Sequence, residues 1–458
     1  MEATPMSSDN SITPELIHYL SGALDAELPP NVLEKAKHHI LDTLAAMVSG
    51  SVLKPGVLAR EYVEKQGGPE EAQVVGSSMV VSAVNAAIAN GMMAHADETD
   101  DSNGSAGIHP GCAILPAALA MGERENVNGS DFIKAVVLGY DIGSRTTKAL
   151  GREEMRARNH LPFSIGGTMG ATAAAGCLAG LKEEQYRDLL SYGAQQASGI
   201  MTYPRDVEHI EKAFIFGGMN ARNGVMAAEM VQMGFTGVYD TFAGDGNFLV
   251  AYADNPRGEQ LVAELGSRYE VMLTNIKKFC VGFPIQSPAE GLLLIMDKHG
   301  IGAGDVEKIV ARLPEGGAHT VNDREMPDIN LQYIFAIALL DGRVSFEAAH
   351  SFERMSDPDV MDLRSRVTLI GDPALSGAQP DYQAIVEVTT RDGTVYEERV
   401  TSFRGRAENP LSREEVGEKA LDLMEPVLGR AQSLDLIETV NRLETLPSVR
   451  ELRPLLSV

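Results

Sequence analysis

Residues 95–121, HADETDDSNGSAGIHPGCAILPAALAM, join two segments in which small apolar residues recur with helical spacing. The first segment, residues 81–93 (VSAVNAAIANGMM), stops before His95, and the second, residues 112–121, follows Pro110. The part between them is therefore predicted to be a loop that joins two buried helices. Loops held by a rigid scaffold are common places for functional residues.

This loop is strongly acidic. Within seven residues it contains His95, Asp97, Glu98, Asp100 and Asp101, and Ser102 follows directly. Carboxylates this close repel one another, which costs stability unless cations, helix N-termini or a catalytic role offset it. An acidic run is most often a solvated loop. Here the apolar helices on both sides, and His109 at the mouth of the second helix, favour a functional site.

The composition limits the classes of partner. The chain has 458 residues, 44% hydrophobic but only 5% aromatic with no Trp, which predicts tightly packed helical layers of Ala, Leu, Ile, Val and Met. A net charge of −25 disfavours nucleic acid and anionic membranes as partners. No run reaches the roughly 18–20 apolar residues that span a bilayer, and residues 1–16 lack the basic and apolar regions of a signal peptide. We therefore expect a cytoplasmic protein.

The three cysteines are far apart and never form a CxxC pair. Their neighbours are apolar in each case (GCAIL at Cys112, AGCLAG at Cys177, KFCVGF at Cys280). They are predicted to be small core residues rather than a disulfide framework or the ligands of an iron–sulfur cluster.

Periodicity divides the chain into two domains. Helical patterns fill residues 1–268, which are predicted to form an all-α domain completed by C-terminal helices within residues 408–458. In its second helix, His38 and His39 are adjacent and cannot share one face, so both are expected to be surface or capping groups. Residues 269–407 are predicted to be a smaller α+β domain, since residues 306–313 and 384–390 alternate like strands. A turn at residues 391–394 would join the latter to a strand at 395–400.

The charged and polar residues suit one type of chemistry. Removal of a proton next to a carboxylate needs a base, a cationic anchor and a donor that stabilises the enolate-like intermediate. His109 and the acidic cluster, including Asp97, Glu98 and Asp101, are candidates for the base or acid. Lys212, Lys277 and Lys278 are candidates for the anchor, and Tyr333 for the proton donor. From the residues alone, surface lysines and a core tyrosine remain the alternatives.

These motifs resemble those of the MmgE/PrpD family, which combines a histidine with an aspartate-rich "HAxDxDD" segment, then "HP" before a helix with a "PAxxA" pattern. Further similarity lies in residues 166–175, 218–224, 276–286 and 330–342. The resemblance implies a mainly α fold, with a large helical domain and a smaller α+β lid domain. It also implies a homodimer formed through the helical domain.

The resemblance to cis-aconitate decarboxylase-like members points to a set of site residues. Matched by motif, they are Glu98, Ser102, His109, Lys277 and Tyr333, with His160 and Lys212 if one residue of slip is allowed. The chain departs from the pattern at Phe216 and Gly282, where histidines are expected, and Gln286 follows the second. Lys278 and Gln286 lie near the domain boundary and are expected to bind substrate with Lys277.

The leading hypothesis is a lyase of the 2-methylcitrate dehydratase type that needs neither a cofactor nor a metal. Its substrate would be a small anionic di- or tricarboxylate, enclosed when the lid domain approaches. An epimerase or isomerase of the iminodisuccinate epimerase type and a cis-aconitate-type decarboxylase are the alternatives. A further alternative is a non-catalytic protein that has the same fold but no activity.

Overall fold

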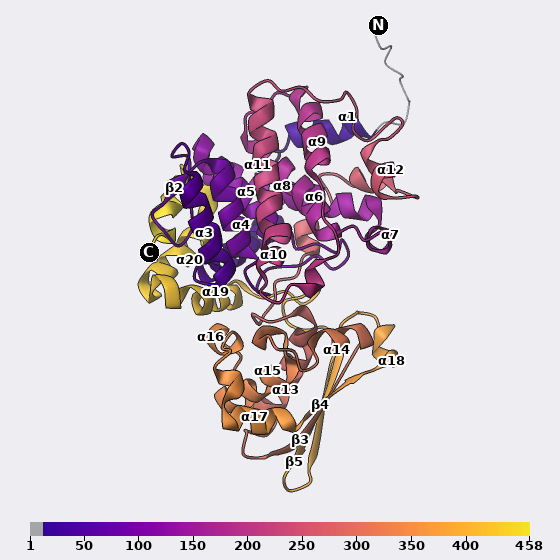
Figure 1. The fold of residues 1–458 in the computed structure, drawn as a ribbon, viewed down its shortest axis with the longest axis vertical. Helices are drawn as coiled ribbons and strands as arrows, with labels where there is room; N and C mark the ends of the chain where they lie inside the picture. The colour runs from indigo at the N-terminus through magenta and orange to yellow at the C-terminus, as the bar shows by residue number, and fades with distance from the viewer. Residues whose placement is uncertain (1–11) are drawn as a thin grey trace. The chain divides into compact units, whose positions relative to one another are not determined.

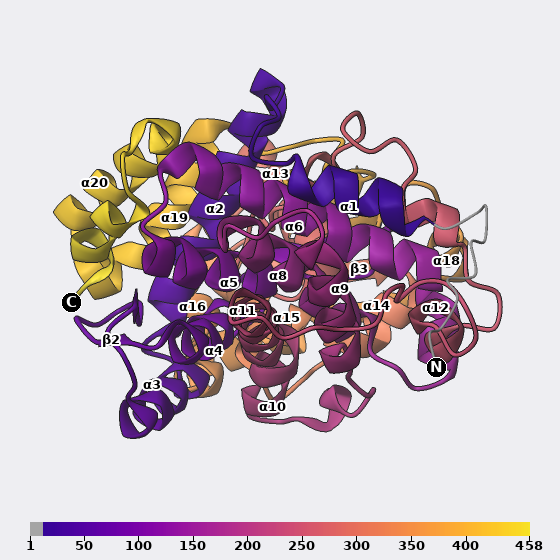
Figure 2. The ribbon, with the colours of Figure 1, turned by 90° about the horizontal axis from the view of Figure 1, so that it is seen from above.

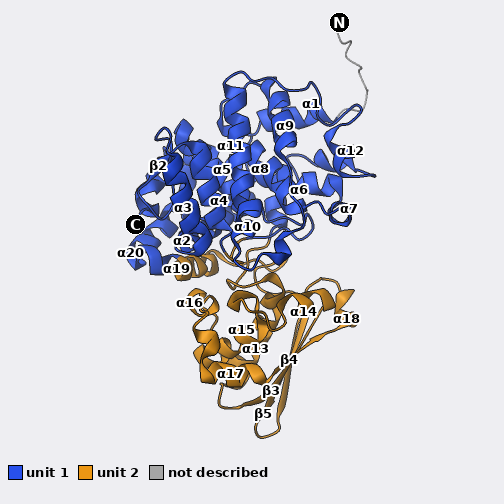
Figure 3. Cartoon of the chain, viewed as in Figure 1, with its two compact units in different colours: residues 1–96, 101–274, 424–458 blue, residues 97–100, 275–423 orange. Residues whose placement is uncertain are grey.

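The computed structural model describes residues 12–458, so most of the N-terminal stretch inspected for a signal peptide lies outside the described residues. The chain divides into two compact units (Figure 3). Unit 1 comprises residues 1–96, 101–274 and 424–458, and unit 2 comprises residues 97–100 and 275–423. The chain passes from unit 1 to unit 2 after Thr274. It returns to unit 1 at Met424, and four residues of the acidic loop, Asp97–Asp100, belong to unit 2.

Unit 1 is helical, as predicted, apart from a short antiparallel pair of strands, β1 (Ala72–Gln73) and β2 (Val80–Val81). Its helices are α1 (Thr13–Ser21), α2 (Pro30–Gly50), α3 (Lys54–Gln66), α4 (Ala83–Ala94), α5 (Pro110–Glu125), α6 (Gly129–Leu150), α7 (Arg152–Ala157), α8 (Pro162–Leu178), α9 (Gln185–Gln196), α10 (Ile210–Ala213), α11 (Met219–Gln232), α12 (Phe248–Tyr252) and α20 (Arg430–Asn441). A π-helical turn, η2 (Phe214–Gly218), joins α10 to α11.

The helices that flank the acidic loop begin where the sequence indicates. The Ser82 side chain accepts a hydrogen bond from Asn85 N and so caps α4. Pro110 occupies the first turn of α5, with His109 at the N-cap position. At the start of α6, the Asn128 side chain accepts the Asp131 N–H and caps the helix.

Helix α8 forms the centre of unit 1, where it packs against α5, α6, α9 and α11 (Figure 1). Glycines let α6 and α8 approach closely. A Cβ atom on Gly143 would lie 2.8 Å from the Gly166 carbonyl oxygen, and one on Gly170 would lie 2.7 Å from that of Gly139. The C-terminal helix α20 packs against α2 at one edge of the unit (Figure 2).

Unit 2 contains a four-stranded sheet in the order β4-β3-β5-β6. Strands β3 (Val306–Leu313), β5 (Ala384–Thr390) and β6 (Val395–Val400) are antiparallel neighbours and match the prediction, whereas β4 (Val367–Gly371), parallel to β3, was not predicted. The helices are α13 (Gln286–His299), α14 (Glu315–Val321), α15 (Leu331–Asp341), α16 (Phe346–Ala349), α17 (Pro358–Ser365), α18 (Pro373–Ser376) and α19 (Arg413–Leu428), the last of which ends in unit 1. The core of unit 2 lies between the sheet and helices α13 and α15.

Within residues 12–458, no single helix is both long and apolar enough to cross a membrane. Helices α2 and α3 satisfy the same criteria only when taken together as a pair bent by 82°. Most of α2 is buried inside unit 1.

All three cysteines are buried and none forms a disulfide within residues 12–458, which confirms that they are small core residues. Burial raises the pKa of the Cys177 and Cys280 thiols to about 12.

Candidate active site

In unit 2, the acidic segment 97–100 surrounds a buried ammonium group. The Lys277 side chain is fully buried, and its Nζ donates a hydrogen bond to the Glu98 carbonyl oxygen at 2.6 Å. The same Nζ lies 3.6 Å from Asp100 Oδ1 and 3.7 Å from Glu98 Oε2. Lys277 is therefore not a solvated surface lysine, and its charge offsets part of the repulsion within the segment.

A second cation, His350, holds Asp97. Its Nε2 lies 2.8 Å from Asp97 Oδ2, and Asp97 also accepts hydrogen bonds from Thr99 N (3.0 Å) and Thr99 Oγ1 (2.7 Å). Burial alone would raise the pKa of Asp97, but the pairing with His350 and the Thr99 hydrogen bonds outweigh it and lower that pKa. Burial alone would lower the pKa of His350, but Asp97 and then Asp328 raise it to about 9.

A third cation reaches the same segment from α19. Lys419 is buried, and its Nζ donates to the Thr99 carbonyl oxygen at 3.1 Å. Among the carboxylates of residues 97–100, the Glu98 side chain is the most exposed, at 12% against 6% for Asp97 and 0% for Asp100. Glu98 is therefore the one best placed to meet a ligand. Asp97 is occupied in fixing the segment, and its predicted catalytic role has no support from this geometry.

Asp101, the remaining carboxylate of the loop, lies in the core of unit 1. It is 0% exposed and accepts hydrogen bonds from His39 Nδ1 (2.6 Å), Tyr140 Oη (2.6 Å) and Gly111 N (2.9 Å). The last bond ties the loop to the first turn of α5. Asp101 is therefore a structural anchor, and the prediction that it acts on substrate has no support from this geometry.

The prediction that His39 is a surface or capping group is wrong. It is fully buried, because α2 packs with both of its sides inside unit 1. Burial and the neighbouring charge of Lys35 lower the pKa of His39 to about 4, despite the hydrogen bond with Asp101. His39 is therefore neutral at physiological pH.

His109 lies at the edge of an aromatic cluster in unit 1. Its ring centroid is 5.3 Å from that of His95, 5.3 Å from that of Phe163 and 5.7 Å from that of Phe216. Phe216, on the π-helical turn η2, also stacks on His95 at 4.5 Å. The Lys212 Nζ lies 5.4 Å from the centre of the Phe216 ring, so the fold gathers His109 and Lys212 around Phe216.

Three histidines of unit 1 offer the side-chain type that binds transition metals. The ring centroid of His95 lies 5.3 Å from that of His109 and 5.2 Å from that of His209. Metal independence stays a prediction that a chelator can test.

Two other predicted residues of unit 1 differ in their settings. Ser102 is 8% exposed, and its buried Oγ has no hydrogen-bond partner among residues 12–458, which makes it a candidate donor to a ligand. His160 follows α7, and its ring packs edge-on against Tyr252 with centroids 5.1 Å apart. The ring contacts found in the described residues do not connect His160 to His109.

Gln286 and Lys278 lie in unit 2 with Lys277, and the Gln286 side chain is used within the fold. Gln286 is fully buried, accepts a hydrogen bond from Phe279 N, and donates to the carbonyl oxygens of Phe279 and Val281. It braces the loop after Lys277, so direct substrate binding by Gln286 has no support. Lys278 is half-buried, and its Nζ lies 5.4 Å from the centre of the Phe279 ring.

Tyr333 lies on α15 inside the core of unit 2, at 0% exposure. Its hydroxyl donates to the Ala348 carbonyl oxygen at 2.6 Å and lies 3.2 Å from that of Ser351. The hydroxyl proton is already engaged, so the predicted role as proton donor has no structural support. Instead, Tyr333 fixes the turn that carries His350.

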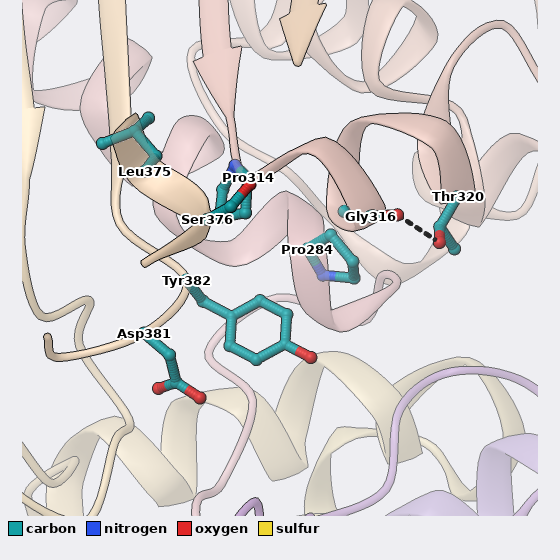
Figure 4. Close-up of a pocket in the computed structure, with 9 residues that line it drawn as sticks. Pro284, Pro314, Gly316, Thr320, Leu375, Ser376, Asp381 and Tyr382 are labelled. Carbon is teal, nitrogen blue, oxygen red and sulfur yellow. Dashed lines mark hydrogen bonds between the residues drawn. The ribbon is translucent and has the colours of Figure 1, made fainter. Parts of the chain in front are cut away.

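Unit 2 also contains a surface cavity of about 330 Å³ (Figure 4). Its lining comes from Pro284, Pro314, Gly316, Gly317, Thr320, Leu375, Ser376, Asp381 and Tyr382. None of the predicted site residues lines it. Proximity of charged groups, rather than this hollow, defines the candidate site.

His350, Lys419 and the anchor at His39 were missed by sequence reasoning. His350 stands in SFEAAHSFE, and Lys419 lies in a mainly acidic helical stretch, REEVGEKALDLMEPVL, so neither is part of a recognisable motif. The acidic loop was the one feature of the sequence that indicated nearby cations. Four close carboxylates require cations, but their positions depend on tertiary packing.

The acidic segment can carry out acid–base chemistry. A carboxylate and an ammonium group 3.7 Å apart can respectively accept and donate a proton, provided that a substrate reaches both. His109 gives unit 1 a second, partly exposed acid–base group.

Comparison with known proteins identifies the family of the chain. Residues 15–260 match the MmgE/PrpD N-terminal domain, and residues 279–445 match the MmgE/PrpD C-terminal domain. The chain is 25% identical to the cis-aconitate decarboxylase-like protein oryM of Aspergillus oryzae, over 100% of this chain and 99% of that protein. It is 26% identical to cis-aconitate decarboxylase of Homo sapiens, over 97% and 94% of the two chains. For cis-aconitate decarboxylase of Aspergillus terreus the identity is 24%, over 100% and 98%. The two matched domains cover most of the sequence, and the chain therefore belongs to the MmgE/PrpD family.

Proposed function

We propose that the protein is a lyase that acts on a small polycarboxylate, with decarboxylation of an unsaturated tricarboxylate such as cis-aconitate as the first candidate reaction. The observation that carries this proposal is the buried Lys277 ammonium group beside the partly exposed Glu98 carboxylate in unit 2. The full-length similarity to cis-aconitate decarboxylases supports the choice of substrate.

The proposed reaction needs one proton and no redox partner. The bond to the departing carboxylate breaks, and its electron pair forms a new carbon–carbon double bond. The electron pair of the old double bond takes a proton at the carbon α to a remaining carboxylate. Carbon dioxide leaves, and an unsaturated dicarboxylate remains in which the double bond has moved by one carbon. The protein must supply a general acid and cationic groups that hold the remaining carboxylates.

The described residues supply candidates for both roles. Glu98 with Lys277 in unit 2, and His109 in unit 1, are the candidate acid–base groups. Lys212, beside the aromatic cluster of His109, is a candidate anchor for a carboxylate. Ser102 offers a hydroxyl that has no hydrogen-bond partner within residues 12–458. The chain has a net charge of −25, so local cations are needed to attract an anionic substrate.

Dehydration is the second candidate, as in the 2-methylcitrate dehydratases of the family. It needs a base that removes the α proton and an acid that protonates the departing hydroxyl. A carboxylate and an ammonium group 3.7 Å apart offer both in one place, which is the observation that favours it. Both reactions transfer a proton at a carbon next to a carboxylate.

The test is a substrate panel with the purified protein. Cis-aconitate, citrate and 2-methylcitrate are each incubated with and without a chelator, and products are identified by proton NMR. We expect carbon dioxide and an unsaturated dicarboxylate from cis-aconitate, insensitive to chelator. Alkene formed from citrate or 2-methylcitrate would instead support dehydration, and proton exchange without net reaction would support epimerisation. No reaction with any of the three would contradict the proposal.

Three variants assign the acid–base groups. Glu98→Gln, Lys277→Met and His109→Asn are each expected to lower kcat by about 100-fold or more, the usual size of a general acid–base contribution. Glu307→Gln, at an exposed position of β3, makes the same chemical change as the first variant and is expected to keep full activity. Equal activity of Glu98→Gln and Glu307→Gln would remove Glu98 from the mechanism.

A homodimer is the proposed assembly. The segment after α11 in unit 1 exposes apolar side chains, namely Met233 at 79%, Phe235 at 47% and Tyr239 at 70%. Such a stretch is suited to burial in a protein interface. Light scattering should give about twice the chain mass, and a monomer would contradict the proposal.

A further inference from the structure

The short turn after α16 in unit 2 carries His350 in a fixed orientation. The ring lies 4.3 Å from the Phe346 ring, centroid to centroid, and its Nδ1 is 2.8 Å from the Phe346 carbonyl oxygen. The Tyr333 hydroxyl holds the turn on both sides of His350, through the carbonyl oxygens of Ala348 and Ser351. His350 therefore has little freedom to move away from Asp97.

Each ring nitrogen of His350 lies 2.8 Å from an oxygen atom, Nδ1 from the Phe346 carbonyl and Nε2 from the Asp97 carboxylate. A carbonyl oxygen can only accept, so Nδ1 carries a proton. Nε2 lies 2.8 Å from Asp97 Oδ2 and 4.0 Å from Asp328 Oδ2, and a proton there is stabilised by both carboxylates. His350 is thus an imidazolium at neutral pH.

Other titratable groups lie near this pair. Cys280 has Asp97, Lys419 and Asp422 among its charged neighbours, and burial keeps its thiol protonated, with a pKa raised to about 12. Asp422 on α19 accepts the Phe346 N–H at 2.8 Å. The Lys419 Nζ donates to the Thr99 carbonyl oxygen. Asp97 and Asp328 are the two carboxylates whose charge raises the pKa of His350, at 2.8 and 4.0 Å from its Nε2.

The contacts of Asp97 extend to Glu98. Asp97 and Thr99 bond to each other across Glu98, through Thr99 N and Thr99 Oγ1. The Glu98 carbonyl oxygen accepts from Lys277, and that of Thr99 accepts from Lys419. The backbone on the C-terminal side of Glu98 is thus held by lysines, and on its N-terminal side by the ion pair with His350.

We infer that His350 is a positioning residue for Glu98, whose charge holds Asp97 in place and thereby fixes the peptide that presents the Glu98 carboxylate. This inference rests on the proposed role of Glu98 in the lyase reaction. His350 itself needs no contact with substrate. Loss of its charge leaves the chemistry of Glu98 intact but lets the carboxylate depart from its productive position.

The first test is a double-mutant cycle in kcat. His350→Gln removes the charge and is expected to lower kcat by about 10- to 100-fold, the range that a small misplacement of a reacting group causes, with a smaller change in KM. In a Glu98→Gln background the same substitution should cost less than about threefold, because there is no longer a carboxylate to position. His319→Gln, at an exposed position of α14, is the matched control. If His350→Gln lowered kcat by the same factor in the wild-type and the Glu98→Gln backgrounds, His350 would have a general structural role and the inference would be overturned.

The second test uses stability and does not depend on activity. His350 has a pKa of about 9 in the folded protein, above the value of 6.5 for an unperturbed histidine. The unfolded chain therefore loses this proton at lower pH, so the stabilisation is complete below pH 6.5 and disappears as pH rises through 9. The difference in melting temperature between wild type and His350→Gln should shrink over this range.

The two tests distinguish the role of His350 from the proposed catalytic role of Glu98. A difference in melting temperature that stays constant from pH 6.5 to 9.5 would overturn the charged state of His350, whatever the activity. Unchanged activity of Glu98→Gln would contradict the proposed function while leaving the pH-dependent stability intact. The inference stands only if the pH dependence and the non-additive cycle are both found.

Discussion

Tyr140→Phe removes a single oxygen atom from the core of unit 1. The Tyr140 hydroxyl donates to Asp101 Oδ2 at 2.6 Å, and both residues are 0% exposed. Desolvation and then the Asp101 charge raise the pKa of Tyr140 well above its usual value, so the phenol keeps the proton that it donates. Phenylalanine preserves the packing of the ring, and the substitution isolates the hydrogen bond.

The expected loss follows from the surroundings of Asp101. Hydrogen bonds to charged groups contribute about 1.5–3 kcal/mol each. After the substitution the carboxylate keeps His39 Nδ1 and Gly111 N as donors, but no water can replace the hydroxyl at a fully buried site without a rearrangement. We therefore expect Tyr140→Phe to lower the free energy of unfolding of unit 1 by about 2–3 kcal/mol, in the upper part of that range.

Urea unfolding followed by circular dichroism is the assay, with the transition of each unit fitted separately because two units need not unfold together. Tyr192→Phe is the matched control. Its hydroxyl donates to the Thr236 carbonyl oxygen in an exposed position, where the loss should stay below about 0.5 kcal/mol. If the two variants lost the same stability, the view of Asp101 as a buried charge that depends on its donors would be refuted.

Two further predictions concern packing and pH. Gly217→Ala should destabilise unit 1 by about 3 kcal/mol or more, because the added Cβ atom would lie 2.0 Å from the Gly91 carbonyl oxygen. Gly304→Ala is the control, because a Cβ atom at that position would have no heavy atom within 4 Å. Equal melting temperatures of the two variants would refute the close contact. His39 has a pKa of about 4 in the folded protein, below the unperturbed 6.5, so the unfolded chain binds the extra proton first and stability should fall between pH 6.5 and 4. His39→Gln should flatten that fall in a thermal-melt series, and parallel curves would contradict the neutral, buried state of His39.

The mainly α architecture was predictable because its signals are local. The proline at the start of α2, the serine before α4 and the alternation in β5 and β6 act over a few residues. The start of α6 is ambiguous in the sequence because Asn128 and Ser130 are both good caps, and the structure uses Asn128. Strand β4 escaped notice because its residues are only partly buried and show no clean alternation.

The candidate site was only partly predictable. Glu98, Lys277 and His109 could be recognised from the acidic loop and its resemblance to a known family. Gln286 and Tyr333 belong to the same similar segments but are used to brace loops, because a motif records which residues occur together and not which ones face a ligand. His350 could not be found at all, since its partner Asp97 is more than 250 residues away in the sequence and only the fold joins them.

The most direct test of the proposed chemistry is the conversion of cis-aconitate by the purified protein in D₂O, followed by proton and carbon NMR. We predict that carbon dioxide is released and that the product carries one solvent deuterium at the carbon α to a remaining carboxylate, at a rate that falls by about 100-fold in Glu98→Gln. A product without solvent deuterium, or one formed equally fast by Glu98→Gln, would contradict proton transfer by the acidic segment that surrounds Lys277.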